Sequence, residues 1–155
     1  MFLISTVFMT VVGTYFVTRM KKLKRIYLIL TLITVLMIFW NLTNAIIFSI
    51  DDEGLVRLLF KLNTSGAFFI PTLTLIFFRK FVKTTDEFDV VDLMLFVPSV
   101  VFCVMFWTPA ADLLYFDIYL THASGLSYAA FSRGPASYVY LAMAYGYMVV
   151  EGFLL

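Results

Sequence analysis

The sequence predicts an all-α protein that crosses a membrane several times, as a polytopic transmembrane helical bundle of about five spans. Hydrophobic residues make up 63% of the chain and charged residues only 14%, whereas soluble domains have roughly 45–50% and about 25%. The charges fall between long uncharged runs, each close to the ~17–25 residues with which a helix crosses a bilayer. These runs show no sustained alternation of polar and apolar residues, which disfavours a β-barrel.

The uncharged runs define the expected spans, and we treat residues 1–155 as a single membrane-embedded domain. The first run could be mistaken for a secretory signal, but its positive charges follow the apolar residues instead of preceding them. We therefore expect it to remain in the protein as a helix. The expected spans are residues 1–19, 26–50, 57–79, 92–109 and 136–155, with an outer loop at 110–135.

The charges in the connecting links predict how the bundle is oriented. Basic residues crowd positions 19–25, between the first two spans, and positions 79–83, after the third. Acidic residues fill positions 51–53, between the second and third spans. Because Lys and Arg accumulate in cytoplasmic links, we expect a multi-pass protein of the cell membrane with its N-terminus outside and its C-terminus in the cytoplasm.

The loop at 110–135 is the longest connection, and its sequence predicts a short extracytoplasmic hairpin. FDIYLT and LSYAAF alternate around HASG, whose glycine suits a turn. Alternation would place Phe116, Ile118 and Leu120 on one face. The hairpin would either close the bundle as a cap or contact a ligand as a lid. His122 is either an exposed turn residue or a pH-sensitive contact, because histidine titrates near neutrality.

Polar side chains inside the expected second and third spans are the first candidates for a functional site. Trp40 and Asn44 are four residues apart on one helix face, Asn41 lies on the adjacent face, and Asn63 lies at a comparable depth in the third span. Such residues commonly bridge membrane helices through hydrogen bonds. They are therefore either structural bridges between the two helices or part of a ligand site.

Two prolines are expected to bend their helices. Pro71 lies in the third span and Pro98 in the fourth, and each removes one backbone hydrogen bond. A kink of this kind is either a tolerated packing feature or a hinge through which an outer ligand moves the inner helix ends.

Glu151 is a carboxylate near the predicted inner end of the fifth span. It lies ~24 Å along a helix that begins at Pro135. It either marks the inner membrane surface, or pairs with an inner basic residue such as Arg79 or Lys80, or serves as a buried relay, since ionisable groups at membrane depth are often functional. We expect the first of these, a structural residue near the inner surface.

Several function classes find no support in the residues. The chain lacks a phosphate-binding GxxxxGK, a GxGxxG after a strand, an HExxH and a GxSxG nucleophile motif. We therefore expect no enzyme, no catalytic residue and no cofactor. Cys103 is the sole cysteine and His122 the sole histidine, so a metal site is not expected. A net charge of +1 implies no affinity for nucleic acid.

Several motifs occur in order along the chain. NLTN follows Trp40 in the second span, a break from Gly66 to Pro71 interrupts the third, WTP closes the fourth, and a YxxH-like hairpin precedes RGPASYVYLAMAYGY. From about Ile26 to Leu155 this order resembles the N-terminal seven-helix sensor region of bacterial histidine kinases. In that family a Gly-Pro step and a Tyr-rich apolar run begin helix five, and the residues that fit are Gly134, Pro135, Tyr138, Ala144, Tyr145 and Tyr147.

The resemblance implies a membrane-embedded sensory input domain of a signal-transduction protein, shortened to about five helices and without its output domain. Implied partners are the lipid bilayer, a small extracytoplasmic or membrane-soluble ligand, and a cytoplasmic output domain or kinase, with a homodimer as one possible assembly. The candidate residues for ligand binding or signalling are Trp40, Asn41, Asn44, Asn63, His122, Tyr145 and Glu151.

Two other functions stay open. The chain could be a small membrane transporter, or a transporter subunit, that moves a solute past the asparagines and Glu151. A transporter should show repeated halves with paired broken helices, and the links here are unlike one another. A scaffold that only holds partner helices is the third alternative.

Overall fold

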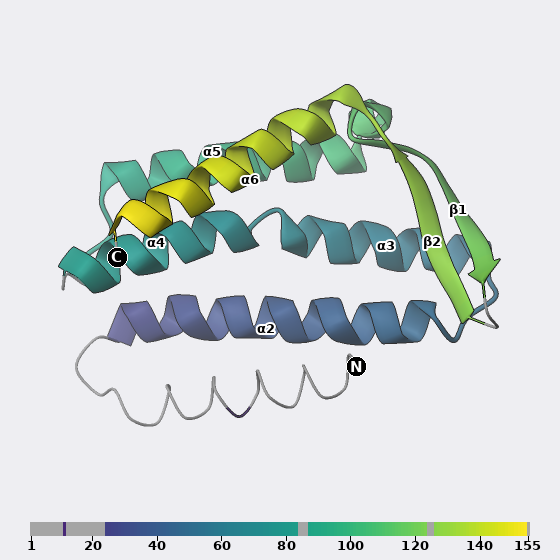
Figure 1. Cartoon of the computed structure of the whole chain (residues 1–155), viewed down its shortest axis with the longest axis horizontal. Helices are drawn as coiled ribbons and strands as arrows, with labels where there is room; N and C mark the ends of the chain where they lie inside the picture. Colours follow the sequence, from purple (N-terminus) through teal and green to yellow (C-terminus); the bar gives the residue numbers. More distant parts are fainter. Residues whose placement is uncertain (1–10, 12–23, 84–86, 124–125, 155) are drawn as a thin grey trace.

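The computed structural model describes residues 11, 24–83, 87–123 and 126–154, and in this part of the chain it is mostly helical. Long helices lie side by side, and a two-stranded β-hairpin projects at one end of the bundle (Figure 1). The elements are α2 (Lys24–Ile47), α3 (Glu53–Ala67), α4 (Ile70–Lys83), α5 (Val90–Trp107), the 3₁₀ helix η1 (Pro109–Leu113), β1 (Tyr115–Ala123), β2 (Leu126–Arg133) and α6 (Pro135–Leu154).

The connections gather at the two ends of the bundle (Figure 1). The hairpin and the connection from α2 to α3 lie at one end, here called the hairpin end. The connection from α4 to α5 and the C-terminal end of α6 lie at the other, here called the link end. This arrangement is compatible with the predicted topology, in which the hairpin end faces outward. The orientation itself stays a prediction.

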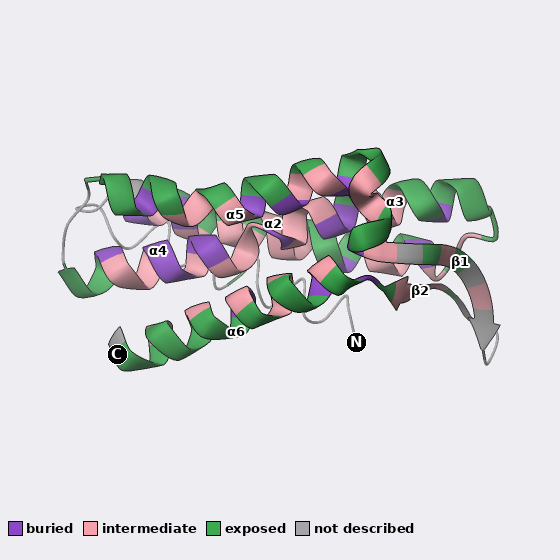
Figure 2. Ribbon diagram, turned by 90° about the horizontal axis from the view of Figure 1, so that it is seen from above, coloured by how far each residue is buried: buried purple, intermediate pink, exposed green. Residues whose placement is uncertain are grey.

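Within the described residues, three helical segments are long and apolar enough to cross a membrane. They are Ile26–Ile47, Glu53–Lys83, which joins α3 and α4, and Val90–Trp107, with mean hydropathies of 2.1, 1.3 and 2.3. Large apolar side chains are exposed along these helices, as expected of surfaces that face lipid (Figure 2). The helical architecture is thus confirmed, but the count of five spans is not. The expected span at residues 1–19 falls outside the described residues except for Val11, and α6 is not among the three segments.

The third predicted span is interrupted between α3 and α4, at Phe68 and Phe69. Pro71 is the second residue of α4, and it has no N–H to donate to the carbonyl oxygen of Ala67 four residues earlier. The hydroxyl of Tyr140, on α6, donates to this oxygen at 3.2 Å instead. Tyr140 therefore connects the helix break to α6. Pro98, by contrast, lies inside α5, which continues through it.

The core next to the break is aromatic. Phe68, Phe102, Phe106 and Leu114 form a buried cluster. The ring of Phe68 meets those of Phe106 and Tyr140 nearly edge-on, at centroid distances of 5.8 and 4.9 Å, a geometry that aromatic pairs favour. This cluster joins the break after α3 to α5 and to the residue that follows η1, and so it fixes the hairpin end of the bundle.

The hairpin is an antiparallel pair with an irregular register. Tyr115 to Phe116 and Tyr119 to Ala123 pair in order with residues of β2, but the register shifts between Phe116 and Tyr119. Asp117, in this interval, has a φ of 52°, a conformation that aspartate tolerates better than most residues. Such a bulge inserts one residue and interrupts the alternation of side chains.

The bulge corrects the predicted alternation along β1. Tyr115 and Ile118 both pack against the aromatic cluster. In a regular strand, residues three apart would point to opposite faces. The expected common face of Phe116, Ile118 and Leu120 does not take the bulge into account, because nothing in the residue pattern indicates it.

Gly134 fixes how the hairpin joins α6. A side chain at this position would place its Cβ 2.3 Å from the carbonyl oxygen of Leu113. Only glycine allows this close approach of two backbones. The Gly134 N–H donates to the carbonyl oxygen of Leu114 at 2.8 Å, and Pro135 then starts α6. The Gly-Pro step therefore positions β2 and α6 against η1.

Candidate functional site

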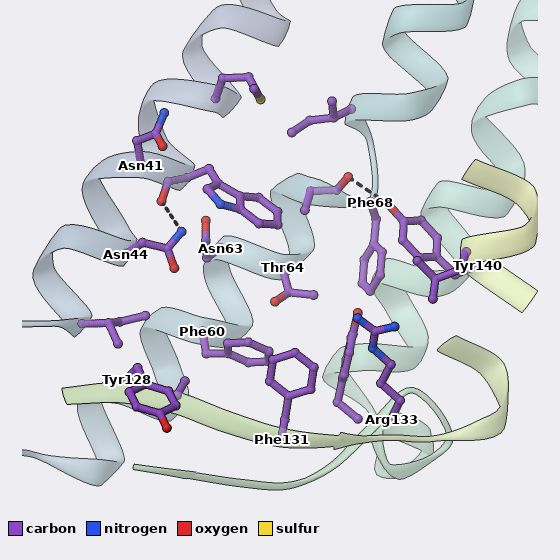
Figure 3. A pocket seen from close by; sticks show the side chains of 18 of the residues that line it. Asn41, Asn44, Phe60, Asn63, Thr64, Phe68, Tyr128, Phe131, Arg133 and Tyr140 are labelled. Atoms are coloured by element: carbon purple, nitrogen blue, oxygen red, sulfur yellow. Dashed lines mark hydrogen bonds between the residues drawn. The ribbon is translucent and has the colours of Figure 1, made fainter. Parts of the chain in front are cut away.

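A cavity of about 700 Å³ lies at the hairpin end, between α2, the region of the α3–α4 break, the hairpin and α6 (Figure 3). This volume lies within the ~300–1,000 Å³ of typical small-molecule sites. Much of its wall is aromatic. The contributing rings come from α2, α3, the break, both strands and α6: Trp40, Phe48, Phe60, Phe68, Tyr115, Tyr128, Phe131 and Tyr140.

The aromatic wall is continuous from α3 to the hairpin. The ring of Phe60 lies 5.0 Å from that of Phe131 and 5.8 Å from that of Tyr115, centroid to centroid. Phe131 and Tyr115 face each other edge-on at 5.0 Å. Because these contacts join β1 and β2 to α3, the hairpin forms one wall of the cavity.

The predicted asparagines meet at this cavity. Asn41 and Asn44 of α2 and Asn63 of α3 all line it, together with Trp40 (Figure 3). The Asn44 amide donates to the carbonyl oxygen of Trp40 at 2.8 Å, within its own helix. Among the described residues no hydrogen bond joins Asn44 to Asn63. The two residues are thus neighbours at one cavity but do not form the predicted bridge with each other.

Asn63 has an unsatisfied acceptor. Its side chain is only 4% exposed, and its Oδ1 accepts no hydrogen bond from any described residue. A buried polar atom without a partner costs about 1–3 kcal/mol. Such a cost is explained if a group that enters the cavity supplies the missing donor.

Arg133, at the end of β2, is the sole charged residue among the described residues that line the cavity. Its side chain extends from the hairpin toward Phe68 and Tyr140 (Figure 3). Burial raises the pKa of Tyr115, and the positive charge of Arg133 opposes this rise. No described carboxylate forms an ion pair with Arg133. The cavity therefore presents a cation without a described counter-ion.

The other predicted site residues lie elsewhere. Tyr145 is 63% exposed on α6 and does not line the cavity. His122 lies near the end of β1, and its side chain is outside the described part of the structure. Glu151 lies near the C-terminal end of α6, at the link end, where its Oε1 has no described partner. Tyr145 and Glu151 are not brought together with the asparagines.

The link end contains an ion cluster. Arg79 Nη2 lies 2.6 Å from Asp89 Oδ2, and Arg79 also pairs with Asp92. Lys80 Nζ lies 2.5 Å from Asp92 Oδ2. The hydrogen bonds from Arg79 hold the pKa of the Asp89 carboxyl well below its usual range. Asp89 and Asp92 also close a capping box at the start of α5.

This cluster overturns one alternative for Glu151. We considered that Glu151 pairs with Arg79 or Lys80, but both cations are bonded to the acidic residues that begin α5. The carboxylates of Asp89 and Asp92 are favoured because they also cap the helix that follows the short connection. The surface and relay alternatives for Glu151 stay open.

Sequence reasoning missed the contribution of the hairpin to the site. Phe131 and Arg133 were not among the candidates, and neither was Phe60. One feature of the sequence could have indicated this contribution. In the segment LSYAAFSR, Arg133 is the sole charged residue and follows polar, aromatic and small side chains. The pairing of that strand with the rest of the cavity depends on the fold and cannot be deduced from its residues.

Comparison with known proteins gives a family for the whole chain. A model described as the N-terminal 7TM region of histidine kinase matches residues 1–155. No curated protein and no solved structure matches the chain significantly. The family match agrees with the helical bundle, the membrane-compatible segments and the Gly-Pro start of α6. This protein belongs to the family of N-terminal seven-transmembrane regions of histidine kinases.

Proposed function

We propose that this chain is the sensory input domain of a receptor of the histidine-kinase type, and that it senses a small ligand in the cavity at the hairpin end. The observation that carries the proposal is the cavity itself: its largely aromatic lining also includes the buried Asn63 and the more exposed Arg133, and neither side chain has a described partner. Ligand sites are typically apolar pockets with a few convergent polar groups. The chain itself performs no catalytic step, and its output comes from a cytoplasmic domain or kinase partner.

The route from cavity to output runs along α6. Tyr140 lines the cavity and donates a hydrogen bond to the carbonyl oxygen of Ala67, at the helix break. The same helix continues to the link end, which is the cytoplasmic side in the predicted topology. A ligand that displaces Phe68 or Tyr140 would therefore move both the α3–α4 break and α6. The coupling needs two helix arrangements that the ligand binds differently.

Orientation is tested with single cysteines in a Cys103→Ser background. Asp52, at the hairpin end, and Lys83, at the link end, are both exposed. In intact cells an impermeant thiol reagent should label a cysteine at position 52 and spare one at position 83. The reverse labelling would place the cavity on the cytoplasmic side and overturn the proposed direction of signalling.

Signalling is tested with the full reading frame that contains this chain, in membrane vesicles. Tyr140→Phe keeps the ring and removes the hydroxyl that bonds Ala67. We expect basal autophosphorylation to change about fivefold, the equivalent of one hydrogen bond. Tyr138→Phe is the matched control, because Tyr138 is on the same helix but exposed. Equal activity of both variants, with normal insertion, would contradict the proposed route.

A further inference from the structure

Two polar groups of the cavity lack partners, and they differ in what they need. Asn63 Oδ1 is a hydrogen-bond acceptor, so it needs an N–H or O–H group. The Arg133 guanidinium offers only donors and a permanent positive charge. The same cavity is lined by aromatic side chains of α3 and the hairpin, among them Phe60 and Phe131. A ligand that satisfies both groups must have polar ends of different kinds and an apolar body.

We propose that this cavity binds an amphipathic organic acid whose carboxylate pairs with Arg133 and whose O–H or N–H group donates to Asn63 Oδ1. The apolar body lies against the aromatic walls. This proposal rests on the proposed sensory function for its biological role, but binding itself requires no kinase.

Charge disfavours a cationic ligand. Among the described lining residues there is no Asp or Glu, so a cationic ligand would meet Arg133 without any compensating carboxylate. A neutral ligand would gain nothing from the charge of the guanidinium. A carboxylate accepts two parallel hydrogen bonds from a guanidinium, which adds geometric selectivity to the charge attraction. Arg133 lies at the exposed edge of the hairpin strand, so this end of the ligand is the one nearest to solvent.

Two kinds of molecule have this combination of groups: a soluble aromatic acid and an acyl-chain acid derived from lipid. The probe for the first is 6-hydroxy-2-naphthoate, and the probe for the second is 10-hydroxydecanoate. Each carries a hydroxyl at the far end of an apolar body from its carboxylate. The methyl esters of both acids remove the charge, and 6-methoxy-2-naphthoate removes the donor.

The experiment measures, by calorimetry, the binding of each acid to the chain in phosphatidylcholine nanodiscs. Partition of the acid into lipid is measured with empty nanodiscs and subtracted. We expect at least one of the two acids to bind, and its methyl ester to bind about tenfold more weakly, as expected for an ion pair at an exposed edge. Binding of the naphthoate alone assigns the soluble source, and binding of the decanoate alone assigns the lipid source.

Variants test which residue binds each polar end of the ligand. Arg133→Gln should weaken the acid about tenfold and leave the ester unchanged, while Arg133→Lys should restore part of the loss. Arg57→Gln is the matched control, because Arg57 is exposed and paired with Glu53 outside the cavity. Asn63→Leu should abolish the preference for the hydroxyl over the methoxy compound. Thr74→Val, another polar-to-apolar change outside the cavity lining, should keep it.

Three results would overturn the proposal: neither acid binds up to about 1 mM, the ester binds as tightly as the acid, or Arg133→Gln binds the acid like the unmodified chain. Unchanged ester binding shows that the Arg133 variant is folded. Failure of acid binding together with a kinase response to Tyr140→Phe would remove this inference and leave the sensory function standing. Acid binding without any kinase response would keep this inference and remove the proposed sensory function.

Discussion

At the link end four charged side chains satisfy one another, whereas at the hairpin end Asn63 and Arg133 have no described partners. Asp92 is completely buried and pairs with both Arg79 and Lys80. Asn63 is almost as buried and lines a cavity, but its Oδ1 has no described partner. Both ends contain polar groups out of contact with water. We interpret the link end as built for stability, and we propose that the hairpin end receives a ligand.

The largest effect is expected at the link end. Asp92→Ala would leave Arg79 and Lys80 with one carboxylate fewer, and Lys80 is only 2% exposed. Breaking a buried ion pair from one side typically costs about 3–5 kcal/mol. Unfolding in mixed micelles, followed by circular dichroism, should register this loss. Glu53→Ala breaks the exposed pair with Arg57 and should cost at most about 1 kcal/mol. Equal losses would refute the structural role of the cluster.

Gly134 provides a test of how rigidly the hairpin end is built. Gly134→Ala would place a Cβ 2.3 Å from the Leu113 carbonyl oxygen, and neither backbone can move without disturbing the core. We expect a loss of about 1–3 kcal/mol, the usual cost of overpacking. Gly146→Ala is the matched control, since open space surrounds that helical glycine. It should be neutral or stabilising by up to about 1 kcal/mol. A tolerated Gly134→Ala would show that the hairpin is docked differently.

Asn63→Leu should have the opposite sign to Asp92→Ala. In the unliganded protein it removes an unsatisfied buried acceptor, which costs about 1–3 kcal/mol, and it keeps a similar volume. We therefore expect the free energy of unfolding to stay the same or rise in the same micelle assay. The sequence alone suggested a hydrogen bond to α2 and hence a loss of up to about 2 kcal/mol on this substitution. Such a loss would favour the bridging interpretation and weaken the case for a ligand site.

The smallest effect concerns pH. The Asp89 pKa is lowered in the folded protein relative to its ordinary value of 3.8. Its contribution to stability is therefore fully present above that value and is lost as the pH falls toward the lower folded pKa. Asp89→Asn should reduce the drop in thermal midpoint between pH 5 and pH 3. An unchanged drop would mean that the Arg79–Asp89 pair contributes nothing measurable.

The helices were predictable because they depend on local composition. Long uncharged runs bounded by charges indicate membrane-compatible helices, and the described helices cover such runs, although α3 begins in a charged segment before its run. Pro71 and Gly66 likewise indicate the break in the third span, since proline removes a specific backbone hydrogen bond. The bulge at Asp117 was not predictable, because an aspartate within an alternating segment does not by itself indicate a positive φ.

The site was predictable only in part. The asparagines stood out because amides are unusual within apolar runs, and the structure brings Asn41, Asn44 and Asn63 to one cavity. Arg79 and Lys80 were interpreted as markers of the cytoplasmic side and as possible partners of Glu151. Their pairing with Asp92 requires α4 and α5 to meet after the connection between them. The role of Arg133 depends on a strand pairing that carries it back over α3, and no local pattern encodes that.

Movement of α6 on ligand binding is the most direct test of the whole account. Spin labels at Val90 and Phe153, both exposed and both at the link end, would report the α5–α6 distance in nanodiscs by double electron–electron resonance. With saturating 6-hydroxy-2-naphthoate or 10-hydroxydecanoate, we expect this distance to shift by about 1–2 Å or more, and Arg133→Gln to need about tenfold more acid for the same shift. An unchanged distance with a bound acid would contradict the claim that the cavity controls the output end.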